Sequence, residues 1–300
     1  IRPLILDEIK SHRFTESKII AEINFRFFKN ISKYDFEVTS LLDWYENQVI
    51  DRGMILGCRK YYPKTNIIGY QCFFVCKNYH PFLAPSEYEK AHSLTPDKNA
   101  VSGELLKDNP SRFTEMVTYE APAFRYENVF KVKELSTCKE NFRILFLFED
   151  SEQKSFQNLK NLILCLESLQ IISKIELMIK PHPRQTHLKV IRMLENKKHK
   201  VVFGDISGFS SSANLIVGSS SSALIEALIF CKNIIVIGNR TGITPNPFPE
   251  RYINNFTFTY DNSELENAIL EAYEKNELYS EPSESVLKDC FYPVTDSTTK

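Results

Sequence analysis

From about residue 142 onward, short hydrophobic runs alternate with segments in which apolar residues recur every three or four positions. Runs of the first kind predict buried strands, and segments of the second kind predict amphipathic helices. The predicted strands are Arg143–Phe148, Ile175–Ile179, Lys200–Phe203, Asn214–Val217, Asn233–Ile237 and Asn255–Thr259, and the predicted helices are Ser155–Leu169, Thr186–Leu194, Ser222–Phe230 and Glu264–Lys275. Alternating strands and helices favour right-handed βαβ units, so we predict a Rossmann-like parallel sheet over residues 142–276.

The first half of the chain has a less regular pattern. It predicts helices over Leu4–Asn30 and Gln48–Gly57, and strands over Glu37–Trp44, Asn66–Gln71, Asn99–Ser102 and Met116–Tyr119. The proline-containing stretch Asn78–Lys98 is too long for a simple connector. We therefore predict a second α/β domain over residues 1–125. We expect this domain to be incomplete at its start, because a helical pattern begins directly at Ile1. A linker is predicted over residues 126–141 and a C-terminal tail over residues 277–300.

The charge balance, the apolar stretches and the cysteine spacing of the chain argue against several classes of protein. The 300 residues include 37 Lys and Arg against 38 Asp and Glu, so no charge excess favours nucleic acid or broad membrane binding. No apolar stretch approaches a membrane span, no signal peptide is present, and the seven cysteines lack metal-site spacing. These features predict a cytoplasmic protein with reduced thiols and no metal site.

Two short polar phrases each follow directly on a predicted buried strand. Lys180-Pro181-His182-Pro183 follows one, and Gly218-Ser219-Ser220-Ser221-Ser222 follows another and opens a predicted helix. In an open parallel sheet, ligands bind outside the carboxyl ends of the strands. A helix N-terminus at that edge offers backbone N–H groups and the positive end of a dipole, which suit an anion. Together the two phrases predict a phosphate-binding site.

The residue types in these phrases fit that chemistry. The flanking prolines restrict the backbone around His182, whose imidazole could donate to a phosphate oxygen or neutralise a departing phosphate; the alternative is a histidine that merely caps a turn. Serine runs are usually flexible linkers, but this one lies between a buried strand and an apolar helix, where one serine would suffice as a cap. Glu226, one turn into that helix, could reach the hydroxyls of a ribose, or it is a solvent-facing glutamate.

A strand ending in His-Pro, followed by a strand ending in serines, resembles the HP and SS motifs of bacterial sialyltransferases. It is also similar to the Kdo transferases of capsule and lipopolysaccharide synthesis and to the CDP-glycerol glycerophosphotransferases. The resemblance implies a GT-B fold, in which two Rossmann-like domains with parallel sheets face each other across a cleft and the C-terminal domain holds the nucleotide-sugar donor. It implies no metal cofactor, and it implies that the phosphate is bound by Lys180, His182, Pro183, Ser219, Ser220, Ser221 and Ser222, with His182 assisting departure of the leaving group.

The first half carries a further phrase, Trp44-Tyr45-Glu46-Asn47-Gln48, which looks like one found in transferases of surface-carbohydrate biosynthesis; Gly69-Tyr70-Gln71 fits the same pattern. An inverting transfer needs a carboxylate base to deprotonate the acceptor hydroxyl. Glu46 is the first candidate, with Asn47, Gln48 and Gln71 expected in the cleft; the alternative is an acid that merely starts a helix.

The sialyltransferases place their base in an acidic pair followed by glycine. The closest phrase in this chain is Glu149-Asp150-Ser151, which lacks the glycine and lies in the second domain. We therefore expect Asp150 to line the donor cleft. If Glu46 is structural, the candidates for the base are Asp43, Asp51 and Asp150.

These observations predict a metal-independent, inverting glycosyltransferase that uses a CMP-activated sugar, of the Kdo or sialic acid type, to build a bacterial surface glycan. Its partners would be a nucleotide-sugar donor and a glycan or lipid-linked glycan acceptor, with peripheral association at the inner face of the membrane. Two alternatives stay open: a polyol-phosphate transferase that uses CDP-glycerol or CDP-ribitol, and a non-catalytic nucleotide- or sugar-binding homologue.

Overall fold

The computed structural model describes residues 15–73, 84–108, 110–132, 134–135, 141–185, 199–219, 221–244, 248–277, 279 and 281–295, together with residues 3, 6, 10 and 11. The chain forms two compact units. The first contains the described residues up to Phe73, those from 84 to Arg125, and those from Asp289 onward. The second contains the described residues from Tyr126 to Lys288.

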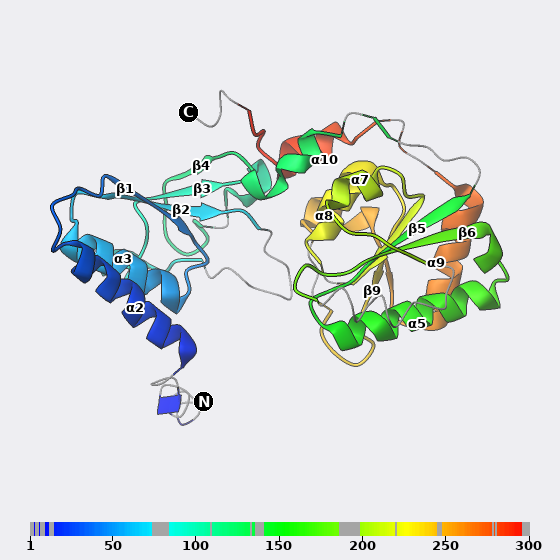
Figure 1. Ribbon diagram of the computed structural model, residues 1–300, viewed down its shortest axis with the longest axis horizontal. Helices are drawn as coiled ribbons and strands as arrows, with labels where there is room; N and C mark the ends of the chain where they lie inside the picture. The colour runs from blue at the N-terminus through cyan, green and yellow to red at the C-terminus, as the bar shows by residue number, and fades with distance from the viewer. Residues whose placement is uncertain are drawn as a thin grey trace. The chain divides into compact units, whose positions relative to one another are not determined.

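The first unit is a four-stranded parallel sheet in the order β1-β2-β3-β4. Its elements are α2 (Glu16–Ile31), β1 (Ser40–Trp44), α3 (Val49–Tyr61), β2 (Asn66–Gln71), α4 (Glu87–Ala91), β3 (Lys98–Val101), η2 (Glu104–Leu106) and β4 (Thr118–Glu120). Helices α2 and α3 pack against each other on one face of the sheet (Figure 1). Their close approach depends on Gly53, where a Cβ would lie 2.2 Å from the carbonyl oxygen of Ala21.

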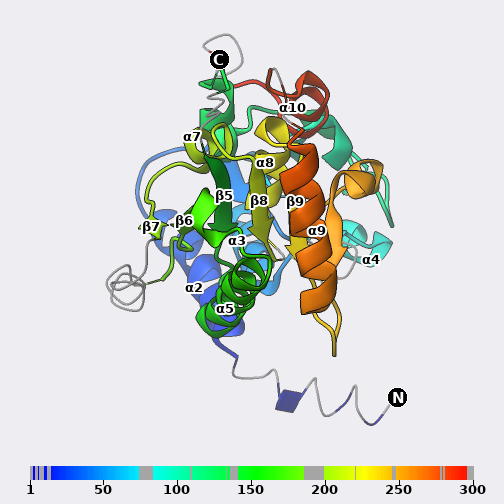
Figure 2. The same cartoon turned by 90° about the vertical axis from the view of Figure 1, so that its right-hand side faces the viewer.

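The second unit is a six-stranded parallel sheet in the order β10-β9-β8-β5-β6-β7. Its elements are η3 (Phe124–Phe130), which begins in the first unit, β5 (Phe142–Leu147), α5 (Glu152–Ser168), η4 (Ile172–Lys174), β6 (Ile175–Lys180), β7 (Lys200–Val201), α7 (Ile206–Ser210), β8 (Leu215–Gly218), α8 (Ala223–Phe230), β9 (Ile234–Ile237), η5 (Glu250–Asn255), β10 (Thr257–Thr259), α9 (Asn262–Lys275) and α10 (Glu284–Cys290). Helices α5 and α9 cover one face of this sheet, and α7 and α8 lie on the other (Figure 1 and Figure 2).

Alternate residues of the strands fill the two faces, as the pleat of a sheet requires. Ile144, Phe146 and Val217 belong to a buried cluster with α5 and α9. On the other face, Leu147 and Leu224 of α8 meet beside Gly218. Because both faces are covered, the strands read as continuous apolar runs, which is why the sequence pattern finds them.

The expected α/β class with two Rossmann-like parallel sheets is confirmed. Every predicted strand is present, with ends shifted by a few residues. The predicted helix Thr186–Leu194 lies outside the described residues. The stretch expected to be irregular contains α4, which begins at Ser86 with a reciprocal cap to Glu89.

The segment interpreted as a C-terminal tail contains α10, and its described end belongs to the first unit. Tyr292 donates its backbone N–H to the carbonyl of Ser102 at 2.6 Å and accepts from the N–H of Ala123 at 3.0 Å. The last residues therefore complete the first unit instead of trailing from the second.

Candidate functional site

The strand order brings the two polar phrases close together at one edge of the second unit. Strand β5 lies between β8, which leads into the serines, and β6, which leads into His182. All three strands are parallel, so their carboxyl ends meet at the same edge. The residues that follow β5, above all Glu149 and Asp150, therefore lie between the two phrases.

Glu149 links the loops that carry the two phrases. Its Oε2 accepts a hydrogen bond from the hydroxyl of Ser219 at 2.6 Å, and its backbone carbonyl accepts one from Nε2 of Gln185 at 2.9 Å. Oε1 of Gln185 in turn accepts from the backbone N–H of His182 at 3.1 Å. Ser219 and Gln185 are both buried. The sequence alone points to no role for Gln185, and its signal for Glu149 is the position of this residue directly after a predicted buried strand.

Oε1 of Glu149 is buried and has no hydrogen-bond partner among the described residues. Buried carboxylate oxygens are almost always satisfied by protein or by water. A donor group on a bound ligand or an ordered water would therefore be held at this point of the edge.

The ring of His182 is oriented by its neighbours. Its Nδ1 lies 3.3 Å from the backbone N–H of Arg184, which donates to it, and 3.7 Å from Oδ1 of Asp150. Asp150 also pairs with Arg184 at 2.8 Å. Because Nδ1 accepts a hydrogen bond, the neutral imidazole carries its proton on Nε2. If the ring gains a second proton, Asp150 is placed to stabilise it.

The serines are placed differently from one another. Ser219 directs its hydroxyl to Glu149 and not to the solvent edge. Ser221 accepts from the backbone N–H of Ala223 at 3.3 Å, so its hydroxyl serves the start of α8. Ser222 precedes the helix, is half-buried and forms no side-chain cap. Ser220 lies outside the described residues.

The positive charge of Lys180 interacts with the negative charge of Glu226 at the same edge. Burial lowers the pKa of Lys180 below its usual range, and the nearby carboxylates of Asp205 and Glu226 offset part of that effect. Glu226 is half-buried, so it is not the fully solvated helix glutamate of the alternative interpretation. An anion bound beside Lys180 would stabilise its charged form further. Pro181 is buried and Pro183 is exposed, so the two prolines bracket the half-buried histidine.

In the first unit, Glu46 is half-buried beside the end of β1. Its Oε1 accepts from the indole N–H of Trp44 at 3.2 Å, and its Oε2 accepts from Nε2 of Gln48 at 2.5 Å. Gln48 precedes α3 and shares a reciprocal cap with Asp51, whose Oδ2 accepts from the backbone N–H groups of Glu46 and Gln48. Much of the phrase therefore builds the turn between β1 and α3.

Asn47 and Gln71 are both buried; each is 1 % exposed. Asn47 takes a left-handed conformation with φ of 55°, and its amide lies 3.4 Å from Oε1 of Glu89. Both polar atoms of the Gln71 side chain lack a hydrogen-bond partner. Asp43 on β1 is also buried, and burial, with a smaller contribution from Asp51, raises its pKa to about 7.

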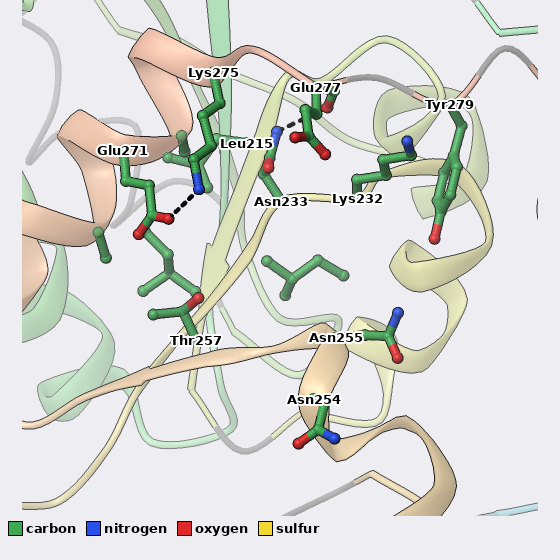
Figure 3. A pocket seen from close by; sticks show the side chains of 14 residues that line it. Leu215, Lys232, Asn233, Asn254, Asn255, Thr257, Glu271, Lys275, Glu277 and Tyr279 are labelled. Atoms are coloured by element: carbon green, nitrogen blue, oxygen red, sulfur yellow. Dashed lines mark hydrogen bonds and ion pairs between the residues drawn. The ribbon is translucent and has the colours of Figure 1, made fainter.

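A hollow of about 480 Å³ lies at the opposite, amino-terminal edge of β8, β9 and β10. Figure 3 shows that in this hollow Lys275 pairs with Glu271 and Asn233 donates to the backbone carbonyl of Glu277. Lys232 lies 5.4 Å from the ring centre of Tyr279. Among the described residues that line this hollow, no buried polar side-chain atom lacks a hydrogen-bond partner, in contrast to the carboxyl edge.

Among the described residues, no group of three or more His, Cys, Asp or Glu side chains could hold a metal ion. Within the same part of the chain, no helix is both long and apolar enough to cross a membrane.

No family model and no curated protein matches the sequence. Solved structures do match the fold. The chain is similar to Staphylococcus aureus MnaA bound to UDP, with a TM-score of 0.57 and 13 % identity over 93 % of this chain and 77 % of that one. It is also similar to the UDP-GlcNAc 2-epimerase of Methanocaldococcus jannaschii, solved with UDP-GlcNAc and UDP, with a TM-score of 0.51 and 14 % identity over 91 % and 79 % of the two chains. At this identity the similarity establishes the GT-B-type fold alone.

Proposed function

We propose that the protein is a glycosyltransferase that takes a nucleotide-activated sugar and transfers the sugar to a glycan acceptor. The observation that carries this proposal is the link through Glu149, which holds the serine loop and the His182 loop together at the carboxyl edge of one sheet. That edge is where open parallel sheets bind nucleotides. The Nε2–H tautomer of His182 suits donation to a phosphate oxygen.

The finer part of the proposal is that the donor is a CMP-activated sugar and that no metal takes part. It follows from the resemblance of the two phrases to those of CMP-sugar transferases. The structures similar in fold were solved with UDP or UDP-GlcNAc, so UDP is the competing nucleotide. Transfer to a bacterial surface glycan remains the proposed outcome.

Calorimetric titration of CMP, CDP and UDP into the full chain, with and without a chelator, tests the donor. We expect CMP to bind at least about 10-fold more tightly than UDP, a difference of about 1.4 kcal/mol, and the chelator to change nothing. Preference for UDP contradicts CMP specificity but keeps nucleotide-sugar chemistry. Preference for CDP, with transfer of a polyol phosphate, favours the alternative of phosphoryl transfer. Binding without turnover of any donor points to a non-catalytic homologue.

Glu46 is proposed as the base that deprotonates the acceptor hydroxyl. Both of its oxygens already accept hydrogen bonds, so one must be given up when the acceptor binds. Glu46→Gln keeps the shape and cannot take a proton, so we expect transfer to be lost while CMP affinity stays within about threefold. Glu22→Gln, on the exposed face of α2, is the matched control. Near-normal transfer by Glu46→Gln would make Glu46 structural.

A further inference from the structure

Another hollow, of about 600 Å³, lies at the carboxyl ends of β9 and β10. It is lined from three directions: Asn158 and Asn161 come from α5, Arg240 follows β9, and Thr259 ends β10 and is followed by Tyr260. All of these residues belong to the second unit. The hollow therefore lies at the same sheet edge as the serine loop. This loop follows β8, and β10 is two strands away from β8, which corresponds to about 10 Å.

Tyr260 is held in place as a platform in this hollow. It is 44 % exposed, yet its ring packs against Gly238, where a Cβ would lie 2.4 Å from ring atom Cε1. Any other residue at position 238 would push the ring aside. Glycine at this position therefore leaves room for the Tyr260 ring, whose surface stays exposed. The apolar face of a sugar ring packs against this kind of aromatic surface.

Thr259 supplies a second, independent sign of a ligand. It lines the hollow, is 2 % exposed, and its hydroxyl has no hydrogen-bond partner in the part of the chain that the structure describes. A buried hydroxyl without a partner costs about 1–3 kcal/mol, so a group that satisfies it binds favourably. Asn158 and Asn161, both half-buried, add carboxamides that donate as well as accept.

The charges around the hollow disfavour a simple anion. The hollow includes the start of α9, but carboxylates already occupy that helix terminus. Asp261 accepts from the backbone N–H of Glu264 at 3.0 Å, and Glu264 accepts from the N–H of Tyr260 at 2.6 Å. The two carboxylates at this helix terminus oppose the single positive charge of Arg240, so the hollow is not a cationic site. The fitting ligand is an uncharged ring bearing several hydroxyls.

We propose that this hollow binds a pyranose ring of a carbohydrate, with one face of the sugar on Tyr260 and a hydroxyl bonded to Thr259. The proposal does not depend on the nucleotide assigned to the serine loop. The ring could be the sugar of the nucleotide donor or a unit of a separate glycan. Both sources offer the same chemistry, and competition experiments distinguish them.

The test is saturation-transfer NMR on the full chain with methyl α-glucoside, methyl α-galactoside and N-acetylglucosamine as uncharged sugar probes and glycerol as a polyol without a ring. We expect at least one of the three sugars to bind and glycerol not to. Tyr260→Ala should weaken sugar binding about 5- to 10-fold, and Thr259→Val about 3- to 10-fold, the loss expected for one hydrogen bond. Tyr260→Phe and Thr259→Ser keep the ring and the hydroxyl and should bind normally. Tyr34→Ala removes an exposed tyrosine of the first unit and is the control.

Competition identifies the source of the ring. Displacement of the bound sugar by UDP-GlcNAc or a CMP-sugar, but not by the nucleotide alone, assigns the hollow to the donor's sugar. Simultaneous binding assigns it to a separate glycan. The proposal is overturned if none of the three sugars binds at millimolar concentration, or if folded Tyr260→Ala and Thr259→Val variants bind them normally. If the full chain binds one of the sugars but none of the nucleotides CMP, CDP and UDP, the proposed function is overturned and this inference stands.

Discussion

At the scale of single residues, the carboxyl edge of the second sheet is defined by how neighbours orient each side chain. The N–H of Arg184 donates to Nδ1 of His182, and this fixes the tautomer. Asp150 is near enough to stabilise a protonated ring. His182 is therefore prepared both to donate a hydrogen bond and to carry a positive charge.

We expect His182→Ala to lower the turnover number of sugar transfer about 100-fold, the usual effect of losing a positioned donor or acid. Its melting temperature should stay near that of the wild type, because the ring is only half-buried in a loop. His182→Gln keeps an N–H donor but no acid, so partial activity in that variant would assign His182 the role of donor. His92→Ala, an exposed histidine of the first unit, is the control. Normal turnover by His182→Ala would remove the residue from the site.

Asp43 leads to a prediction about stability and pH. Burial raises its pKa from 3.8 to about 7, so the folded state resists its ionisation. Its contribution to stability is therefore fully present below pH 4 and is lost as the pH rises through 7, by a free energy of unfolding on the order of 4 kcal/mol.

Asp43→Asn cannot ionise, so the variant should be more stable than the wild type at pH 8 and gain nothing at pH 4. Urea denaturation of both proteins at the two pH values measures the difference. A difference between the proteins that does not change with pH would show that Asp43 does not titrate in this range.

At the scale of elements, the packing of α2 on α3 depends on the absence of a side chain. A Cβ at Gly53 would lie 2.2 Å from the oxygen and 2.6 Å from the Cα of Ala21, both backbone atoms that no rotamer change can move. We expect Gly53→Ala to lower the free energy of unfolding by about 1–3 kcal/mol, because the two helices must separate.

Gly208→Ala is the matched control for this prediction. Gly208 lies within α7, and a Cβ at this position would meet no atom within 4 Å. Alanine there should be neutral or stabilising by up to about 1 kcal/mol, since glycine is the poorer helix former. Equal effects from both substitutions, measured by urea denaturation, would contradict the packing argument.

At the scale of the whole molecule, the chain returns to its first unit at the end. Gly103 allows this, because a Cβ there would lie 2.2 Å from the carbonyl oxygen of Cys290. We expect Gly103→Ala to displace the last segment and to speed amide hydrogen exchange at Tyr292 and Ala123, which take part in the two hydrogen bonds described above. Amides of α9 in the second unit serve as the internal reference. Unchanged exchange at both positions would show that the segment is not held there.

The sequence by itself determined the elements and their class. Strands β5, β6, β8 and β9 are buried on both faces, so their apolar runs and the helical spacing between them are visible in any short window. The same local signals located His182 and the serines directly after strands. Helix α4 also has a local signal, because Ser86 and Glu89 have the spacing of a reciprocal cap, but the interpretation of this stretch as irregular did not use it.

Only the tertiary structure decided what those residues meet. Ser219 and Glu149 are 70 positions apart and Gln185 and Glu149 are 36 apart, and they bond because β5 lies between β8 and β6. Likewise, the burial of Asn47 and Gln71 and the platform made by Gly238 and Tyr260 depend on which segments pack together. Hydrophobic periodicity reports how one segment is buried, a local quantity. Strand order and side-chain partners depend on the packing of the whole chain, which no local pattern encodes.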